Sequence, residues 1–206
     1  GYLLAFSGML LGAFIARAAD PEQMLPAYYL ALGLATPVAF GSTRLQEVVL
    51  TFHPIYGKNR KTLKFALCAG AVMGLLPLLF TLPGLAEFYY VHLQNLSRGD
   101  LWIVRMAAFS LMVFPMSVAL RAQGEGLAGF ARKPMTIIAG QGAYLTTILV
   151  SGFVTLFAGV PGNLIGGISL LLGNLASTST VRLLLKRIGR QELPVPPTIT
   201  SYGQIR

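Results

Sequence analysis

The sequence predicts an all-α integral membrane protein, a bundle of six transmembrane helices, from three observations. Of its 206 residues, 54% are hydrophobic and only 11% are charged, less than half of the charged share of an average soluble domain. The 23 glycines and 12 prolines fall mostly inside apolar runs, where transmembrane helices tolerate them better than soluble helices do. Six apolar segments reach about 20 residues, the length that crosses a bilayer as a helix.

These six segments form one membrane domain, residues 1–190, and a polar cytoplasmic tail follows at 191–206. We place the helices at 1–19, 26–52, 63–83, 102–122, 135–159 and 162–185. The first segment ends in Ala16-Arg17-Ala18, a pattern typical of a signal-peptidase site. We expect a first spanning helix here, with a cleavable signal peptide as the alternative.

Basic residues are concentrated in alternate loops. If the segments alternate in direction, one side holds twelve of them: Lys58, Arg60, Lys61, Lys64, Arg121, Arg132, Lys133, Arg182, Lys186, Arg187, Arg190 and Arg206. The opposite side holds Arg17 and Arg98. This positive-inside bias predicts a multi-pass protein of the inner or plasma membrane with both termini in the cytoplasm. The net charge of +9 therefore reflects topology, and we expect no nucleic acid partner.

Polar groups inside the membrane are costly and often functional, and the second segment carries the clearest set. Thr36, Thr43, Arg44 and Glu47 fall on neighbouring positions of one helix face. One interpretation is a self-neutralising pair of Arg44 with Glu47, the arginine reaching toward the interface. The other is that Arg44 presents its guanidinium to an anionic substrate and Glu47 tunes it.

Two further polar stripes lie on the last two segments. The fifth carries Gln141, Tyr144, Thr147 and Ser151, and the sixth carries Asn174, Ser177, Thr178 and Arg182. Such stripes form interhelical hydrogen bonds in many membrane proteins. Alternatively, together with Arg105 and Arg121, they line one cavity with a cationic bias.

Prolines and glycines predict bends and close helix contacts. Pro37, Pro77 and Pro115 stand near the middle of apolar segments, where transporters bend. A glycine-rich polar hinge with Gln123 and Glu125 is expected after Arg121, at the cytoplasmic face. Three glycine pairs with a spacing of four predict close approach of helix backbones: Gly8/Gly12, Gly70/Gly74 and Gly162/Gly166. The short connection 159–162 predicts that the fifth and sixth helices form an antiparallel hairpin.

Catalytic chemistry is not indicated. The single cysteine, Cys68, lies in an apolar run, and His53 and His92 fall on opposite sides of the membrane. No paired carboxylates suit general acid–base work. We therefore expect no enzyme, no cofactor and no metal site.

Two stretches resemble the progressive ankylosis family of the multidrug/oligosaccharidyl-lipid/polysaccharide-type transporters. They are FPMSVALRAQGEGLAGFARKPMTIIAGQGAYLTTILV at 114–150 and PGNLIGGISLLLGNLASTSTVRLLL at 161–185. VVLTFHPIYGKNRKTLKF at 48–65 is similar in layout. The chain then corresponds to the C-terminal six-helix half of a fold that normally has twelve helices.

The resemblance implies export of anions such as citrate, pyrophosphate or nucleotide by alternating access. Its candidate substrate-path residues are Arg44, Glu47, Arg105 and Arg121, to which the polar stripes add Gln141 and Asn174. Alternating access needs two bundles, so three arrangements stay open. The chain is part of a longer transporter, or pairs with a second copy, or is a structural subunit in a larger membrane complex that transports nothing.

Overall fold

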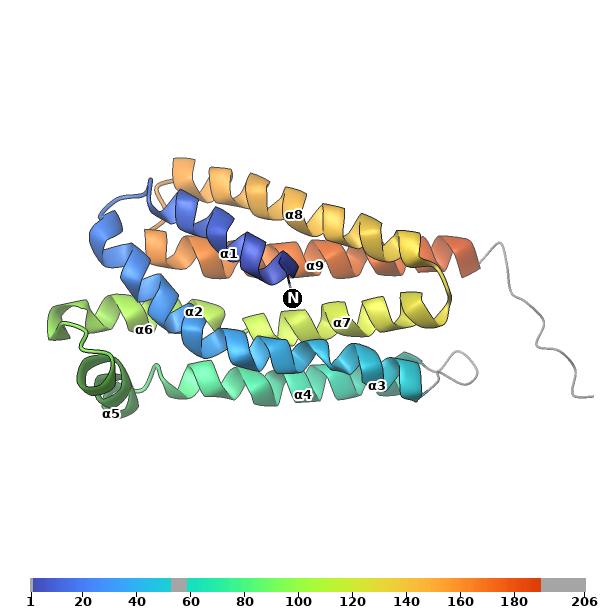
Figure 1. The fold of residues 1–206 in the computed structure, drawn as a ribbon, viewed down its shortest axis with the longest axis horizontal. Coiled ribbons are helices and arrows are strands. Elements are labelled where there is room, and N and C mark those ends of the chain that lie inside the picture. Colours follow the sequence, from blue (N-terminus) through green and yellow to red (C-terminus); the bar gives the residue numbers. More distant parts are fainter. Residues whose placement is uncertain (1, 53–58, 190–206) are drawn as a thin grey trace, which may run out of the picture.

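The computed structural model describes residues 2–52 and 59–189, and these residues form helices without any strand. The long helices run side by side as a bundle (Figure 1). Their bounds are α1 (Tyr2–Ile15), α2 (Pro21–Thr43), α3 (Leu45–Thr51), α4 (Asn59–Leu79), α6 (Leu101–Leu111), α7 (Phe114–Phe130), α8 (Pro134–Phe157) and α9 (Gly162–Gly189). The tail at 191–206 and His53 lie outside the described residues.

Five stretches are long and apolar enough to cross a membrane, which confirms a helical multi-pass membrane protein. They are Pro21–Thr51, Arg60–Leu79, Arg98–Phe130, Pro134–Phe157 and Gly162–Ile188. The expected first span is shorter than predicted, because α1 ends at Ile15. Its N-terminal end lies part-way along the bundle, beside α8 and α9 (Figure 1). The structure therefore supports five of the six predicted spans by length.

The central helix of the bundle is α7, which packs against α2, α3, α4, α8 and α9. A short break at 112–113 separates it from α6, directly before Pro115. Proline lacks an N–H and clashes with the preceding turn, and the helix is interrupted here. The glycine-rich hinge expected after Arg121 was wrong, because α7 continues without interruption to Phe130.

The segment expected as an outer loop, 84–101, is mostly helical. It contains α5 (Pro83–Ala86), the π-helical turns η2 (Glu87–Leu93) and the short 3-10 helix η3 (Arg98–Asp100). Pro83 begins a new helix at its first turn, where a missing N–H costs nothing, instead of ending the third span. Tyr90 is buried beneath this segment, and burial, with a smaller contribution from Tyr89, raises the pKa of its hydroxyl.

Neither Pro37 nor Pro77 interrupts its helix. Helix α2 passes Pro37 without interruption, although Figure 1 shows that its direction changes along its length. Pro77 stands two residues before α4 ends at Leu79. Only Pro115 lies beside a break in the described helices.

The glycine pairs are used unequally. A Cβ at Gly70 would lie 2.7 Å from Met116 Cα, and one at Gly74 would clash with the Met112 carbonyl oxygen. Gly12 and Gly166 likewise face tyrosine side chains, whereas Gly8 has no atom within 4 Å of an added Cβ. The predicted close approach of backbones is therefore clearest between α4 and α7.

The loops gather at two ends of the bundle, as the alternating spans require (Figure 1). The C-terminal ends of α3, α7 and α9 lie together at one end (Figure 1), and we call it the basic end. It holds Arg60, Lys61, Lys64, Arg132, Lys133, Lys186 and Arg187. The opposite end holds Arg17 and Arg98 together with four carboxylates, Asp20, Glu22, Glu87 and Asp100.

Candidate functional site

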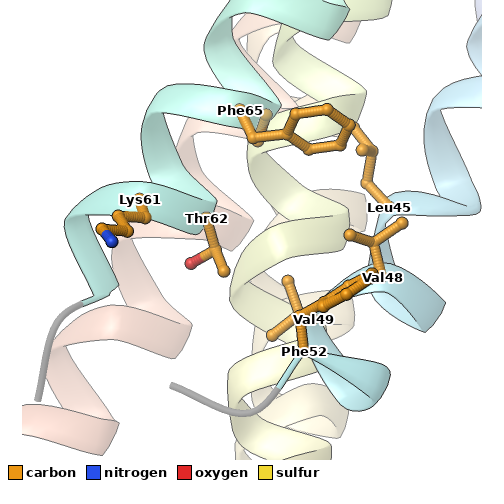
Figure 2. Close-up of a pocket in the computed structure, with 8 residues that line it drawn as sticks. Leu45, Val48, Val49, Phe52, Lys61, Thr62 and Phe65 are labelled. Carbon is orange, nitrogen blue, oxygen red and sulfur yellow. The ribbon is translucent and has the colours of Figure 1, made fainter. Parts of the chain in front are cut away.

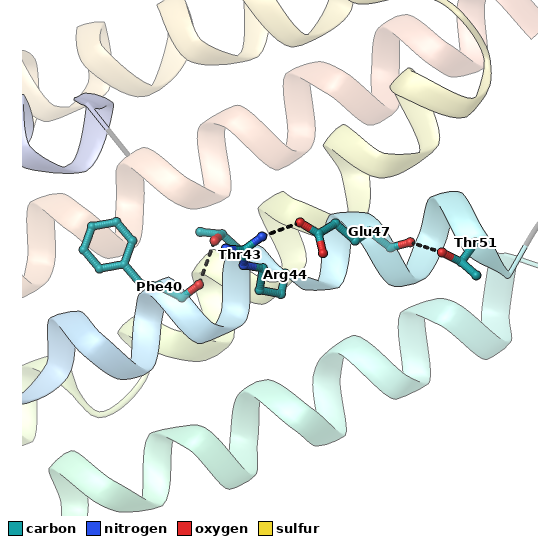
Figure 3. Close-up of polar contacts among 5 residues, drawn as sticks. All are labelled: Phe40, Thr43, Arg44, Glu47 and Thr51. Carbon is teal, nitrogen blue, oxygen red and sulfur yellow. Dashed lines mark hydrogen bonds and ion pairs between the residues drawn. The ribbon is translucent and has the colours of Figure 1, made fainter.

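The arginine–glutamate pair of the second span forms as its spacing predicts, but on the outside of the bundle. Arg44 Nη1 lies 2.6 Å from Glu47 Oε1, and the two side chains are 76% and 64% exposed. In Figure 3 the pair is flanked by Thr43, which donates to the Phe40 carbonyl, and Thr51, which donates to the Glu47 carbonyl. Arg44 stands about 10 Å before the end of α3 at 1.5 Å per residue, within reach of the interface for a long cationic side chain.

Arg105 lies near the opposite end. Its Nε donates to the Thr81 carbonyl at 2.7 Å, and its guanidinium carbon stands 5.9 Å from the centre of the Trp102 ring. With Met106 and Phe109 these residues line a cavity of about 250 Å³. Sixteen residues separate Arg105 from Arg121, about 24 Å along a helix, so the two arginines belong to different sites.

Arg121 is buried inside the bundle, within α7, and not in the connection 121–134 where the sequence placed it. It stands nine residues before the end of α7, about 14 Å along the axis. Its side chain is 7% exposed, and that of Glu125 one turn later is 14% exposed. Because residues four apart share a helix face, the two meet, with Arg121 Nε 3.6 Å from Glu125 Oε1.

An aromatic ring of α8 covers the guanidinium of Arg121. Its central carbon lies 4.9 Å from the centre of the Tyr144 ring, a cation–π distance. Tyr144 in turn donates from its hydroxyl to Ser7 Oγ of α1 at 3.0 Å. Helices α7, α8 and α1 therefore hold the arginine in one orientation.

The pairing of Arg121 is incomplete. The 3.6 Å contact with Glu125 exceeds the length of a hydrogen bond, and within the described part of the chain neither Nε nor Nη1 has an acceptor. Two buried atoms of α9, Asn174 Oδ1 and Ser177 Oγ, also lack partners there. A buried donor without an acceptor costs about 1–3 kcal/mol, and more when charged, so any acceptor that reached these nitrogens would lower this cost.

A second polar chain crosses α7 through Gln123. This residue is buried, donates from Nε2 to Thr62 Oγ1 of α4 at 3.3 Å, and accepts from Arg182 Nη2 of α9 at 2.9 Å. One amide thereby joins three helices. Arg182 is half-buried, so its guanidinium stands between the core and the basic end.

The stripes on α8 and α9 are only partly interhelical. Tyr144 contacts another helix, but Asn174 Nδ2 donates to the Leu170 carbonyl and Thr178 to the Asn174 carbonyl, both within α9. Gln141 is half-buried on α8. Most of these groups bond within their own helix, and Asn174 Oδ1 has no partner among the described residues.

The open side of α2 borders a cavity of about 260 Å³. Its lining comes from four helices and is mostly apolar, with Thr36 and Tyr29 as its polar members. Thr36 donates to the carbonyl of Leu32 on its own helix at 2.6 Å. Phe40 lines the same cavity, and it directly precedes the turn that carries Arg44.

Sequence reasoning missed Glu125 and Gln123 as core residues, because both were assigned to the expected hinge. The available signal was the spacing of four between Arg121 and Glu125, which places two side chains on one helix face just as the spacing of three does for Arg44 and Glu47. Comparison with protein-family models, with curated proteins and with solved structures gives no match.

Proposed function

We propose that this chain is half of a membrane transporter that exports small organic or inorganic anions by alternating access. The observation that carries the proposal is the buried Arg121, whose Nε and Nη1 lack acceptors among the described residues. A carboxylate or phosphate oxygen satisfies such donors with charge-assisted hydrogen bonds. Intramembrane arginines that face the interior of a bundle are typical of substrate pathways.

Glu125 has a defined role in this proposal. It stands 3.6 Å from Arg121 Nε, close enough to neutralise the guanidinium but too far to satisfy it. An entering anion therefore gains hydrogen bonds that Glu125 does not make. When the anion leaves, Glu125 remains as the counter-charge, so the arginine is never buried alone.

The open face of α2 is the proposed contact with a second six-helix half, from a longer chain or a second copy. Thr36 and Phe40 of α2 line the cavity on this face, and the pair of Arg44 with Glu47 follows directly, at the start of α3. Two bundles that rock around a site between them are the arrangement that alternating access requires. We place the basic end in the cytoplasm, following the positive-inside bias.

Anion flux in vesicles tests the proposal. Purified protein is reconstituted in liposomes, and efflux of citrate, pyrophosphate and a nucleotide is measured for the wild type, Arg121→Lys and Arg132→Lys. Lysine keeps the charge but loses the paired donors of guanidinium, so Arg121→Lys should reduce flux about tenfold or more. Arg132 is exposed at the basic end, and its replacement should leave flux unchanged.

A structural subunit of a larger membrane complex is the second candidate function, and the exposure of Arg44 and Glu47 favours it. A charged pair on the outer face suits a protein partner as well as a water-lined path. This candidate predicts no flux of the three anions in any variant, together with a native assembly larger than a dimer. Equal flux in wild type and Arg121→Lys would also reject the Arg121 site.

A further inference from the structure

A groove between α3 and α4 lies at the basic end, separate from the Arg121 site. It has a volume of about 240 Å³. Figure 2 shows its two walls, with Leu45, Val48, Val49 and Phe52 on one side and Phe65 of α4 on the other. Lys61 and Thr62, from the first turn of α4, complete the lining.

The groove exists because α3 and α4 both pack on α7 through glycines. A Cβ at Gly126 of α7 would lie 2.8 Å from Val49 Cβ, and one at Gly70 of α4 would lie 2.9 Å from Ala119 Cβ. The residues that meet beneath the groove are small: Ala66, Ala119 and Ala122 cluster with Leu45. Their methyl groups do not fill the space between α3 and α4, so the apolar groove remains above α7.

The chemistry of the groove is divided between its walls and its rim. The walls are apolar, and the aromatic rings of Phe52 and Phe65 are 69% and 53% exposed. At the rim, Lys61 is exposed, with Arg60 and Lys64 on the same turns of α4. Among residues 2–52 and 59–189, no carboxylate forms an ion pair with Lys61, and Glu47 of α3 pairs with Arg44.

We propose that this groove binds an anionic phospholipid of the surrounding bilayer, with part of one acyl chain between α3 and α4 and the phosphate at Lys61. Apolar walls with a cationic rim match the two parts of such a lipid, and basic pockets between transmembrane helices bind anionic headgroups. The volume is below the roughly 300–1,000 Å³ of pockets for drug-sized ligands. A chain segment fits that space better than a bulky soluble compound.

The groove also connects to the core by side-chain hydrogen bonds. Thr62, which lines it, accepts from Gln123, and Gln123 accepts from Arg182. A lipid that orders the first turn of α4 therefore also orders this polar chain. Bound anionic lipid should raise the unfolding temperature of the whole bundle, since ligands that bind only the folded state stabilise it.

Lipid titration of the full chain tests the proposal. The purified protein in detergent is titrated with phosphatidylglycerol or phosphatidylcholine, and bound lipid is counted by native mass spectrometry. The variants are Lys61→Gln, Val48→Trp and, as matched control, Lys186→Gln, which removes an exposed lysine of the same end on α9. Thermal unfolding without added lipid checks that each variant is folded.

We expect the wild type to bind phosphatidylglycerol more tightly than phosphatidylcholine. Lys61→Gln should weaken phosphatidylglycerol binding about fivefold, the effect of one basic residue near an anionic surface, and leave phosphatidylcholine binding unchanged. Val48→Trp should weaken both lipids by filling the groove. Equal affinity of the wild type for the two lipids, or equal losses in Lys61→Gln and Lys186→Gln, would overturn the assignment, as would displacement of the lipid by inorganic phosphate alone. None of these outcomes depends on anion flux.

Discussion

The molecule contains two arginine–glutamate pairs near the basic end, and they differ in ways that separate surface chemistry from core chemistry. Arg44 and Glu47 are 2.6 Å apart with side chains 76% and 64% exposed, whereas Arg121 and Glu125 are 3.6 Å apart with side chains 7% and 14% exposed. The shorter contact is the weaker argument for function. Both side chains of an exposed pair stay solvated, so their contact contributes little free energy. The longer contact lies where desolvation is costly.

The largest expected effect on stability comes from removing one partner of the inner pair, Arg121 with Glu125. Glu125→Ala leaves a buried guanidinium without a counter-charge, which costs about 3–5 kcal/mol in buried ion pairs. The free energy of unfolding, measured in detergent by chemical denaturation, should fall accordingly. The double variant Arg121→Met/Glu125→Met should recover most of this stability, since apolar residues of similar volume replace a buried pair at little cost.

The double variant also separates stability from transport. It should fold and still lose anion flux, because the donors of Arg121 are absent. A double variant that is as unstable as Glu125→Ala would show that the pair supports packing through other contacts. A stable double variant with normal flux would remove Arg121 from the substrate path.

An intermediate effect on stability is expected at the contact between α7, which carries the inner pair, and α3, which carries Glu47 of the outer pair. Gly126 of α7 meets Val49 of α3, where an added Cβ would lie 2.8 Å from Val49 Cβ. Gly126→Ala should therefore destabilise the protein by about 1–3 kcal/mol, as overpacking does. The control is Gly142→Ala on α8, where nothing lies within 4 Å of an added Cβ. That change should be neutral or slightly stabilising, since alanine is the better helix former. Equal thermal midpoints for the two variants would contradict tight packing of α3 on α7.

The smallest effect on stability is expected from the outer pair, Arg44 with Glu47. Arg44→Ala or Glu47→Ala should change stability by about 0–1 kcal/mol, because both side chains are exposed. If Arg44 lines the transport path, flux should fall while stability does not. Should Arg44→Ala instead cost as much stability as Glu125→Ala, the contrast between the two pairs would be wrong.

The sequence predicted the outer pair but not the inner one, and the reason lies in how glycine was interpreted. Composition and segment length were enough for a helical membrane protein, and the spacing of Arg44 and Glu47 was enough for their contact. Gly124, Gly126 and Gly129 were taken as a hinge that interrupts the helix after Arg121. In the structure Gly126 instead provides room for α3, and α7 stays helical around Glu125.

The same ambiguity affected the segment that was expected as an outer loop. Pro83 and Gly84 looked like the end of the third span, yet proline is equally suited to the first turn of a new helix. Local sequence cannot distinguish a residue that ends one helix from one that begins the next. The segment after Pro83 is instead held in helical form by tertiary contacts, because Ala86 and Tyr90 pack with Ala27 and Val104. These contacts join distant parts of the chain, so sequence spacing does not predict them.

The junction between α6 and α7 has a consequence for how the molecule can move. Gly70 brings the backbone of α4 against Met116 in the first turn of α7, and Gly74 brings it against Met112 in the break itself. A bend beside Pro115 therefore cannot occur in α7 alone, because α4 has no space in which to remain still. A displacement of α7 at this position would carry α4 with it, and a crosslink between α4 and α7 should leave such a displacement intact.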